Sequence, residues 1–140
     1  MPDKKRALIL QHIIENPAGR VGVILDEYEI PYHLVHVGRD HLPDPTRYQA
    51  IIVLGGSQHL YDKHRYPYTV HEEAYLHSAI KQGIPYLGMC LGGQLLANAF
   101  QATVKKLPKV HIGFLNVHFS EAGLQDPLYK GLYEIRVSSV

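Results

Sequence analysis

Apolar residues along this chain fall into short runs, and these runs alternate with stretches of helical spacing. Continuous apolar runs are typical of strands buried on both faces, and strict alternation is typical of half-buried strands. The runs predict strands over residues 7–10, 32–37, 50–54, 84–87, 103–107, 112–119 and 133–139. Apolar positions three and four apart predict a helix after Gly19, a second helix with Gly83 as its C-cap, and a third after Cys90.

This order of elements predicts the fold class. Strands that alternate with helices favour a parallel, doubly wound sheet, so we expect an α/β protein with a flavodoxin-like three-layer sandwich and a mostly parallel sheet. In such sheets, ligands bind beyond the carboxyl ends of the strands. Gly55-Gly56 and Cys90 each follow a predicted strand, and we therefore expect both turns at one edge of the sheet.

Two polar segments carry further expectations. Glu72 and Glu73 are predicted to form the solvated first turn of a helix, where negative charge is favourable. Asp126-Pro127 is predicted to open a short helical turn before the last strand.

Length and charge limit the classes of function. The chain has 140 residues, and we expect a single domain over residues 1–140. Lys and Arg number 14 against 13 Asp and Glu, so the net charge of +1 gives no reason to expect a nucleic-acid or membrane partner. One cysteine cannot form an internal disulfide, which favours a reducing cytoplasm.

The lone cysteine lies on a glycine-flanked turn, Gly88-Met89-Cys90-Leu91-Gly92-Gly93-Gln94. Glycines two residues before and after a nucleophile are the pattern of a nucleophile elbow, here with sulfur in place of oxygen. The helix that follows has free N–H groups, which favour a thiolate and can hold an oxyanion, with Leu91 N–H as the first donor. Most free cysteines are small buried hydrophobes, but the turn favours a nucleophile at Cys90.

The ten histidines raise the question of a metal site. No two of them stand four residues apart on a predicted helix, and His33 and His36 face opposite sides of a predicted strand. One cysteine cannot build a zinc cluster. Gly55-Gly56-Ser57 lacks a following lysine and is a weak phosphate-binding signal. We therefore expect no metal site and no cofactor.

The turn around Cys90 resembles the nucleophile motif of class I glutamine amidotransferases. The similarity extends over residues 85–97, and Leu54-Gly55-Gly56-Ser57 resembles the oxyanion loop of that family. Gln11-His12 and residues 15–19 resemble its GMP-synthase-like branch, as does Ile112-Gly113-Phe114. His111 stands where that branch commonly has an acidic residue. The resemblance covers residues 7 to about 135.

The resemblance implies hydrolysis of the side-chain amide of L-glutamine through a cysteine thioester. Cys90 would be the nucleophile, Gly56 and Leu91 would donate N–H groups to the oxyanion, and Gly55 and Gln94 would bind the substrate. In most members of the family, ammonia passes to a synthetase. Here we expect such an acceptor on another chain.

The family takes its general base from a late His-x-Glu motif, and no such triplet follows Cys90. We therefore expect a partial amidotransferase domain that lacks the catalytic histidine and glutamate and turns over glutamine negligibly. His59, His111 and His118 are candidate replacements, but for each we favour an ordinary surface or packed histidine.

Two other classes of function stay open. One is a non-catalytic protein that binds glutamine or regulates a partner. The other is a different cysteine hydrolase of similar fold, which would place a histidine directly after the nucleophile, where Leu91 stands. An uncovered strand edge favours self-association, so we also expect a homo-oligomer.

Overall fold

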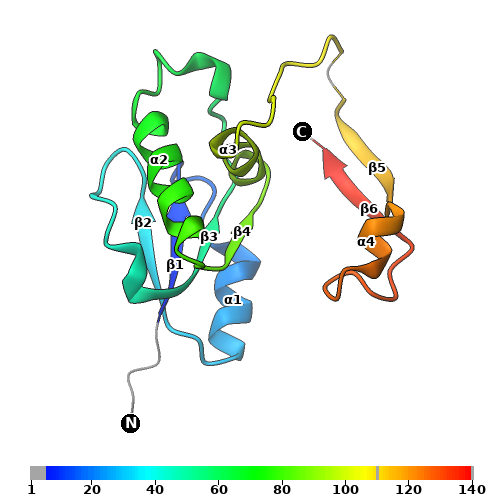
Figure 1. Ribbon diagram of the computed structural model, residues 1–140, viewed down its shortest axis with the longest axis horizontal. Coiled ribbons are helices and arrows are strands. Elements are labelled where there is room, and N and C mark those ends of the chain that lie inside the picture. The colour runs from blue at the N-terminus through cyan, green and yellow to red at the C-terminus, as the bar shows by residue number, and fades with distance from the viewer. Residues whose placement is uncertain (1–5, 110, 140) are drawn as a thin grey trace. The chain divides into compact units, whose positions relative to one another are not determined.

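The computed structural model describes residues 6–109 and 111–139 of the chain (Figure 1). Its contacts divide the chain into two compact units, Met1–Lys105 and Lys106–Val140. The first unit carries Cys90 and the glycine-rich turns. That residues 1–140 form a single domain stays a prediction.

A four-stranded parallel sheet forms the centre of the first unit. Its strands lie in the order β2-β1-β3-β4, and their bounds are β1 Arg6–Gln11, β2 Tyr32–His36, β3 Tyr48–Val53 and β4 Tyr86–Gly88. Leu8 in β1 is paired with His33 on one side and with Ile51 on the other. Strands β1 and β3 are the two central strands of the sheet. Both are rich in apolar residues, as expected for strands that are covered on both faces.

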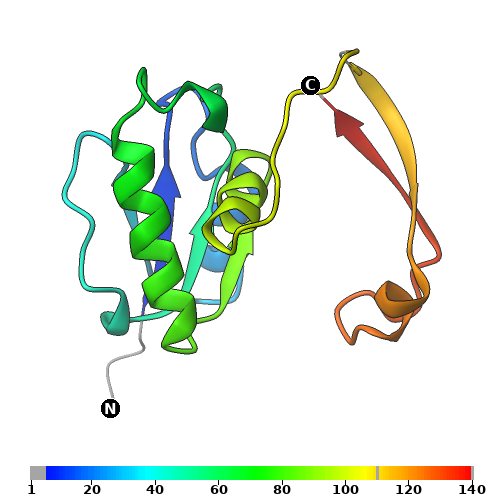
Figure 2. The same ribbon diagram turned by 45° about the horizontal axis from the view of Figure 1, so that its top comes forward.

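Helices cover both faces of this sheet, so the first unit is a three-layer sandwich. Helix α1 (Gly19–Glu27) lies behind the sheet in Figure 2, and α2 (Tyr68–Lys81) and α3 (Leu91–Ala99) lie in front of it. Leu8 packs in a cluster with Leu76, whereas its neighbour Ile9 packs with Leu25 on the opposite face. Burial of one such leucine contributes about 1.5–3 kcal/mol. The strand order is flavodoxin-like, and the predicted α/β class with a mostly parallel sheet is confirmed.

Short 3-10 turns precede two of these elements, at Pro45–Arg47 and Leu60–Asp62. Helix α2 ends where the sequence predicts. Gly83 follows the helix with φ +81°, a left-handed conformation that glycine adopts at low cost.

The second unit is a β-hairpin with one short helix. Strand β5 (Gly113–His118) pairs antiparallel with β6 (Glu134–Ser139), and α4 (Glu121–Gln125) lies between them in sequence. The Ser120 side-chain oxygen accepts a hydrogen bond from Gly123 N–H at 3.2 Å, so Ser120 caps α4. The two strands predicted in this part of the chain are present.

Two expectations from the sequence are wrong, and a third holds. Residues 103–107 form no strand, since only Val104 packs against the core and its neighbours are exposed. Asp126-Pro127 does open a turn as predicted, since Tyr129 N–H donates to Asp126 O at 3.0 Å and Leu128 N–H donates to Asp126 Oδ1 at 2.8 Å; helix α4 precedes this turn. Glu72 is completely buried instead of solvated, because it faces His12 from α2.

None of the helices in the described parts of the chain is long and apolar enough to cross a membrane.

Candidate active site

Cys90 lies on a sharp turn between β4 and α3. Met89 N–H donates to Val53 O at 3.0 Å, so Cys90 is the first residue beyond the sheet. Its backbone has φ 51° and ψ −110°, a conformation that costs an L-residue about 1–3 kcal/mol. The residue is exposed. The strained turn therefore presents the thiol to solvent at the N-terminus of a helix.

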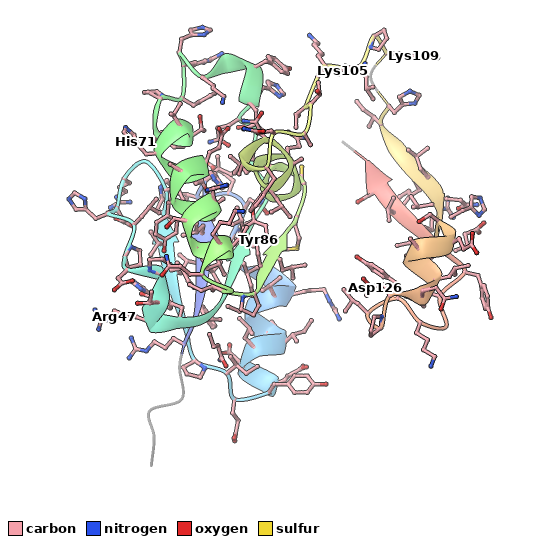
Figure 3. The ribbon with its side chains drawn as sticks, viewed as in Figure 1. Arg47, His71, Tyr86, Lys105, Lys109 and Asp126 are labelled. Atoms are coloured by element: carbon pink, nitrogen blue, oxygen red, sulfur yellow. The ribbon has the colours of Figure 1, made fainter. Side chains whose placement is uncertain are left out.

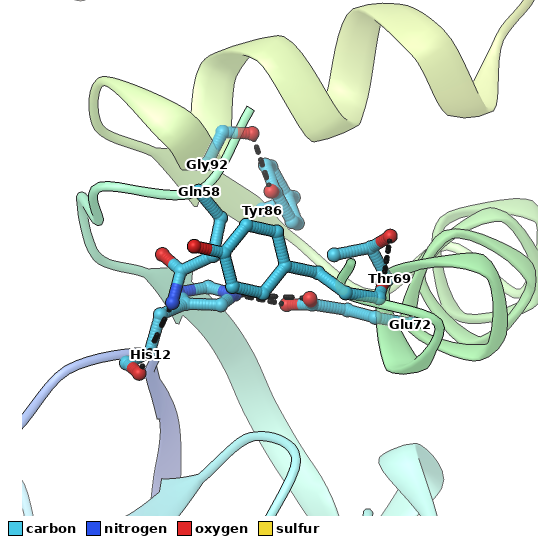
Figure 4. A network of polar contacts seen from close by, with 7 residues as sticks. His12, Gln58, Thr69, Glu72, Tyr86 and Gly92 are labelled. Atoms are coloured by element: carbon cyan, nitrogen blue, oxygen red, sulfur yellow. Dashed lines mark hydrogen bonds and ion pairs between the residues drawn. The ribbon is translucent and has the colours of Figure 1, made fainter. Parts of the chain in front are cut away.

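The two glycines that flank Cys90 allow the chain to turn this tightly. A Cβ atom on Gly92 would overlap the Val53 carbonyl oxygen, and one on Gly88 would overlap the Gly92 backbone. Tyr86, which is labelled in Figure 3, supports the turn, since its hydroxyl donates to Gly92 O at 2.7 Å (Figure 4). Burial raises the pKa of the Tyr86 phenol well above its usual value, so the hydroxyl remains a donor.

The loop after β3 lies beside this turn. A Cβ on Gly55 would lie 3.3 Å from Cys90 Cβ, and Asn16 Nδ2 donates to Gly55 O at 3.1 Å. A Cβ on Gly56 would lie 2.9 Å from Leu91 Cδ2. The structure thus brings together four residues that the sequence singles out: Gly55, Gly56, Cys90 and Leu91.

An open cleft of about 340 Å³ borders the thiol. Its walls come from the loop and first turn of α1, from the end of β3 and from the elbow. The residues that line it are Asn16, Pro17, Ala18, Gly19, Arg20, Val21, Leu54, Gly55, Met89 and Cys90. Leu91 is the first residue of α3, and its N–H has no acceptor within the helix. The cleft can therefore hold a small polar molecule against a nucleophile and a helix N-terminus.

Of the candidate residues, Gly55 and Cys90 line the cleft, whereas Gly56 and Leu91 are not among its lining residues, and neither is Gln94. Gln94 is exposed on α3, and its backbone N–H donates to Cys90 O at 3.2 Å. The side chain of Gln94 is not among those that line the cleft. A role for Gln94 in substrate binding stays a prediction.

The histidines considered as replacement bases lie in ordinary surroundings. His59 is exposed and stacks on Tyr61, with 4.9 Å between ring centroids. His111 and His118 belong to the second unit, where His118 Nδ1 lies 3.3 Å from Glu134 Oε2. Within the described residues, no group of three His, Cys, Asp or Glu side chains could hold a metal ion.

A His-x-Glu triplet does occur before the nucleophile, at His71-Glu72-Glu73 in α2. His71 is exposed, whereas Glu73 binds Lys63 at 3.0 Å. Residues two apart on a helix do not face each other. This triplet therefore cannot act as a catalytic pair.

One further pair, His12 and Glu72, lies beside the loop and has no signature in the sequence. His12 Nε2 lies 2.9 Å from both carboxylate oxygens of Glu72. Neither side chain has exposed surface. Their separation of 60 residues hides the pair from any pattern in the sequence.

The comparisons with known proteins agree on one family. The model of class I glutamine amidotransferases matches residues 21–135. The glutamine amidotransferase-like protein YfeJ of Salmonella typhimurium is 31% identical over 111 residues, 72% of this chain and 44% of that protein. The glutamine-hydrolysing GMP synthase of Lactobacillus delbrueckii subsp. bulgaricus is 35% identical over 89 residues, 64% of this chain and 16% of that protein.

A solved structure shows the same fold. A glutamine amidotransferase from Thermotoga maritima matches with a TM-score of 0.86 and 24% identity, over 96% of this chain and 59% of its own. The chain therefore spans less than two thirds of the length of each of these relatives. Since the family model covers most of the chain, the protein belongs to the class I glutamine amidotransferases.

Proposed function

We propose that this site takes L-glutamine and that Cys90 cleaves its side-chain amide. The observation that carries the proposal is the strained elbow, which exposes Cys90 beside Gly55 and above the N-terminus of α3. A strained residue at a helix N-terminus in a cleft is typical of a nucleophile. The family membership supports glutamine as the substrate.

The proposed reaction has two halves. The Cys90 thiolate adds to the amide carbon, and the carbonyl electrons move to oxygen, where the N–H groups of Gly56 and Leu91 stabilise them. The C–N bond then breaks, a proton reaches the nitrogen, and ammonia leaves a glutamyl thioester. Water adds to the thioester, the C–S bond breaks, and glutamate leaves.

Proton transfer in both halves needs a general base. A second candidate function is binding of glutamine without turnover. The open cleft beside Cys90 supports it, because binding needs only the cleft and not a general base.

We also propose that any ammonia formed reaches a synthetase on another chain. The support for a synthetase as the acceptor is the similarity to a glutamine-hydrolysing GMP synthase. The lone cysteine fits a reducing compartment, and we propose the cytoplasm as the location.

Glutamate and ammonia release from L-glutamine tests the proposal, with Cys90→Ser as the control. Turnover that the substitution abolishes supports cysteine hydrolysis. Calorimetric binding of glutamine without turnover supports the second candidate. If glutamine does not bind, and if a thiol reagent labels Cys90 equally fast with and without glutamine, both candidate functions are contradicted.

A further inference from the structure

The buried pair of His12 and Glu72 joins two elements below the glycine loop (Figure 4). His12 follows the end of β1, and Glu72 lies in the second turn of α2. The Nε2–H group of His12 donates to the carboxylate, with 2.9 Å to each oxygen. This double contact fixes the imidazole ring, since neither side chain is exposed.

The glycine loop rests on His12. A Cβ on Gly56 would lie 3.1 Å from His12 Cβ, so the two backbones are packed against each other. Gln58, two residues further along the loop, donates from Nε2 to His12 O at 3.4 Å. The position of the Gly55–Gly56 peptide therefore depends on where His12 is held.

The pair does not itself form a catalytic dyad. Glu72 lies on α2, which covers the face of the sheet opposite α1, whereas residues of the α1 loop line the cleft beside Cys90. His12 Nε2 is bonded to Glu72, and His12 Nδ1 is a buried atom with no partner among the described residues. No ring nitrogen of His12 belongs to the lining of the cleft.

Fold stability does not require an ionisable pair at this place. Replacing a buried ionic pair by apolar residues of similar volume is often neutral or stabilising. The pair belongs to a polar network with Gln58, Thr69 and Tyr86 (Figure 4), whereas most of the core consists of apolar residues such as Leu8 and Leu76. The pair thus needs an explanation other than packing, and its contact with Gly56 supplies one.

We infer that His12 and Glu72 are positioning residues, which hold the Gly55–Gly56 peptide so that Gly56 N–H can donate to an oxyanion formed at Cys90. The inference rests on the proposed function. Displacement of a catalytic group by 1 Å costs up to about 100-fold in rate. A loop that contains two adjacent glycines has little stiffness of its own and needs such a support.

Two cysteine reagents separate this role from a general effect on the fold. The chloromethyl ketone analogue of glutamine alkylates a thiol as chloride leaves, and its carbonyl oxygen occupies the oxyanion position. An aromatic disulfide, dithionitrobenzoate, reacts by exchange with the thiolate and forms no oxyanion. The ratio of the two rate constants at Cys90 therefore reports the oxyanion donors.

The main variant combines His12→Leu with Glu72→Leu. The two leucines fill a similar volume with apolar side chains and remove the hydrogen bonds between the pair. Glu72→Gln keeps an acceptor for His12 and should rescue most of the ratio. Thr69→Val is the matched control, because Thr69 is buried in the same helix but donates to Tyr66 O at 2.7 Å, away from the loop. Should the double variant not fold, His12→Asn serves in its place, since its shorter side chain cannot reach Glu72 while its Cβ and carbonyl oxygen stay against the loop.

We expect the double variant to lower the ketone-to-disulfide ratio at least about tenfold, because loss of one oxyanion donor costs about 100-fold or more. Thr69→Val should leave the ratio unchanged. Suppose that glutamine slows the labelling of wild-type Cys90 and that the double variant has the wild-type ratio. This result would overturn the inference and leave the proposed function intact. Wild-type labelling that glutamine does not slow would instead overturn the proposed function.

Discussion

Cys90 keeps its strained conformation because two neighbouring residues have no side chains. Gly92 approaches the Val53 carbonyl oxygen and Gly88 approaches Gly92 so closely that a Cβ atom on either would overlap backbone atoms. Gly93 differs, since a Cβ there would meet only Gly88 O at 3.7 Å, which is ordinary contact. The elbow therefore depends on the position of each glycine and not on their number.

This difference gives a prediction with a matched control one residue away. Gly92→Ala should lower the free energy of unfolding by about 1–3 kcal/mol, as overpacking does. It should also slow labelling of Cys90, because the elbow must shift. Gly93→Ala should raise stability by up to about 1 kcal/mol, since alanine is the better helix former. Urea unfolding measures both, and equal losses for the two variants would contradict the overlap at Gly92.

The roles of three residues of the site could not be predicted from the sequence. The elbow at Cys90 could be predicted because all its parts lie within seven consecutive residues. Asn16 and His12 hold the neighbouring loop through Gly55 O and Gly56, and these contacts form only when β1 and β3 pair. Glu72 reads as a solvated charge at the start of a helix, and its buried partner His12 is 60 residues away in the sequence.

Strands were predicted well where the sheet buries both faces. Residues 7–10 and 50–54 are continuous apolar runs, and both lie in the central strands. Residues 103–107 contain only two apolar residues, Val104 and Leu107, with two lysines between them, and only the side chain of Val104 reaches the core. A short apolar run predicts a strand only if a neighbouring strand is present to pair with it, and sequence spacing does not contain that information.

Strand β4 and helix α2 each contribute a tyrosine whose ionisation is coupled to folding. Burial raises the pKa of the phenols of Tyr86 and Tyr75 well above the usual value of 10.0. Above about pH 10 the unfolded chain loses these protons while the folded chain keeps them, so stability falls as pH rises. At lower pH both states are protonated and the contribution is fully present.

Substitution of each tyrosine by phenylalanine should change stability by different amounts at pH 8. Both substitutions should change the alkaline pH dependence of stability in the same direction. Tyr86→Phe loses the hydrogen bond to Gly92 O and should cost about 1 kcal/mol at pH 8. Tyr75→Phe loses no bond among the described residues, since the Tyr75 hydroxyl has no partner there, and should cost little. Each substitution should reduce the fall in stability between pH 9 and pH 11, relative to wild type. Urea titrations across that range measure this, and curves parallel to wild type would contradict the coupling.

The whole first unit has a sheet with two edges, β2 and β4, each paired on one side only among the described strands. Strand β4 has only three residues, and Leu87 at its centre is 50% exposed. An uncovered strand edge with an exposed apolar side chain favours pairing with another chain. We therefore expect self-association that begins at β4.

Light scattering over a range of concentrations tests this expectation. The weight-average mass should rise with concentration in wild type, and Leu87→Lys should suppress the rise because a charge at an edge strand opposes pairing. Leu34→Lys is the matched control on the opposite edge strand, where Leu34 is 39% exposed. It should leave the rise unchanged if β4 is the contact. A constant monomer mass at high concentration would show that the β4 edge does not associate. Equal suppression by both variants would show that added charge, and not the β4 edge, controls self-association.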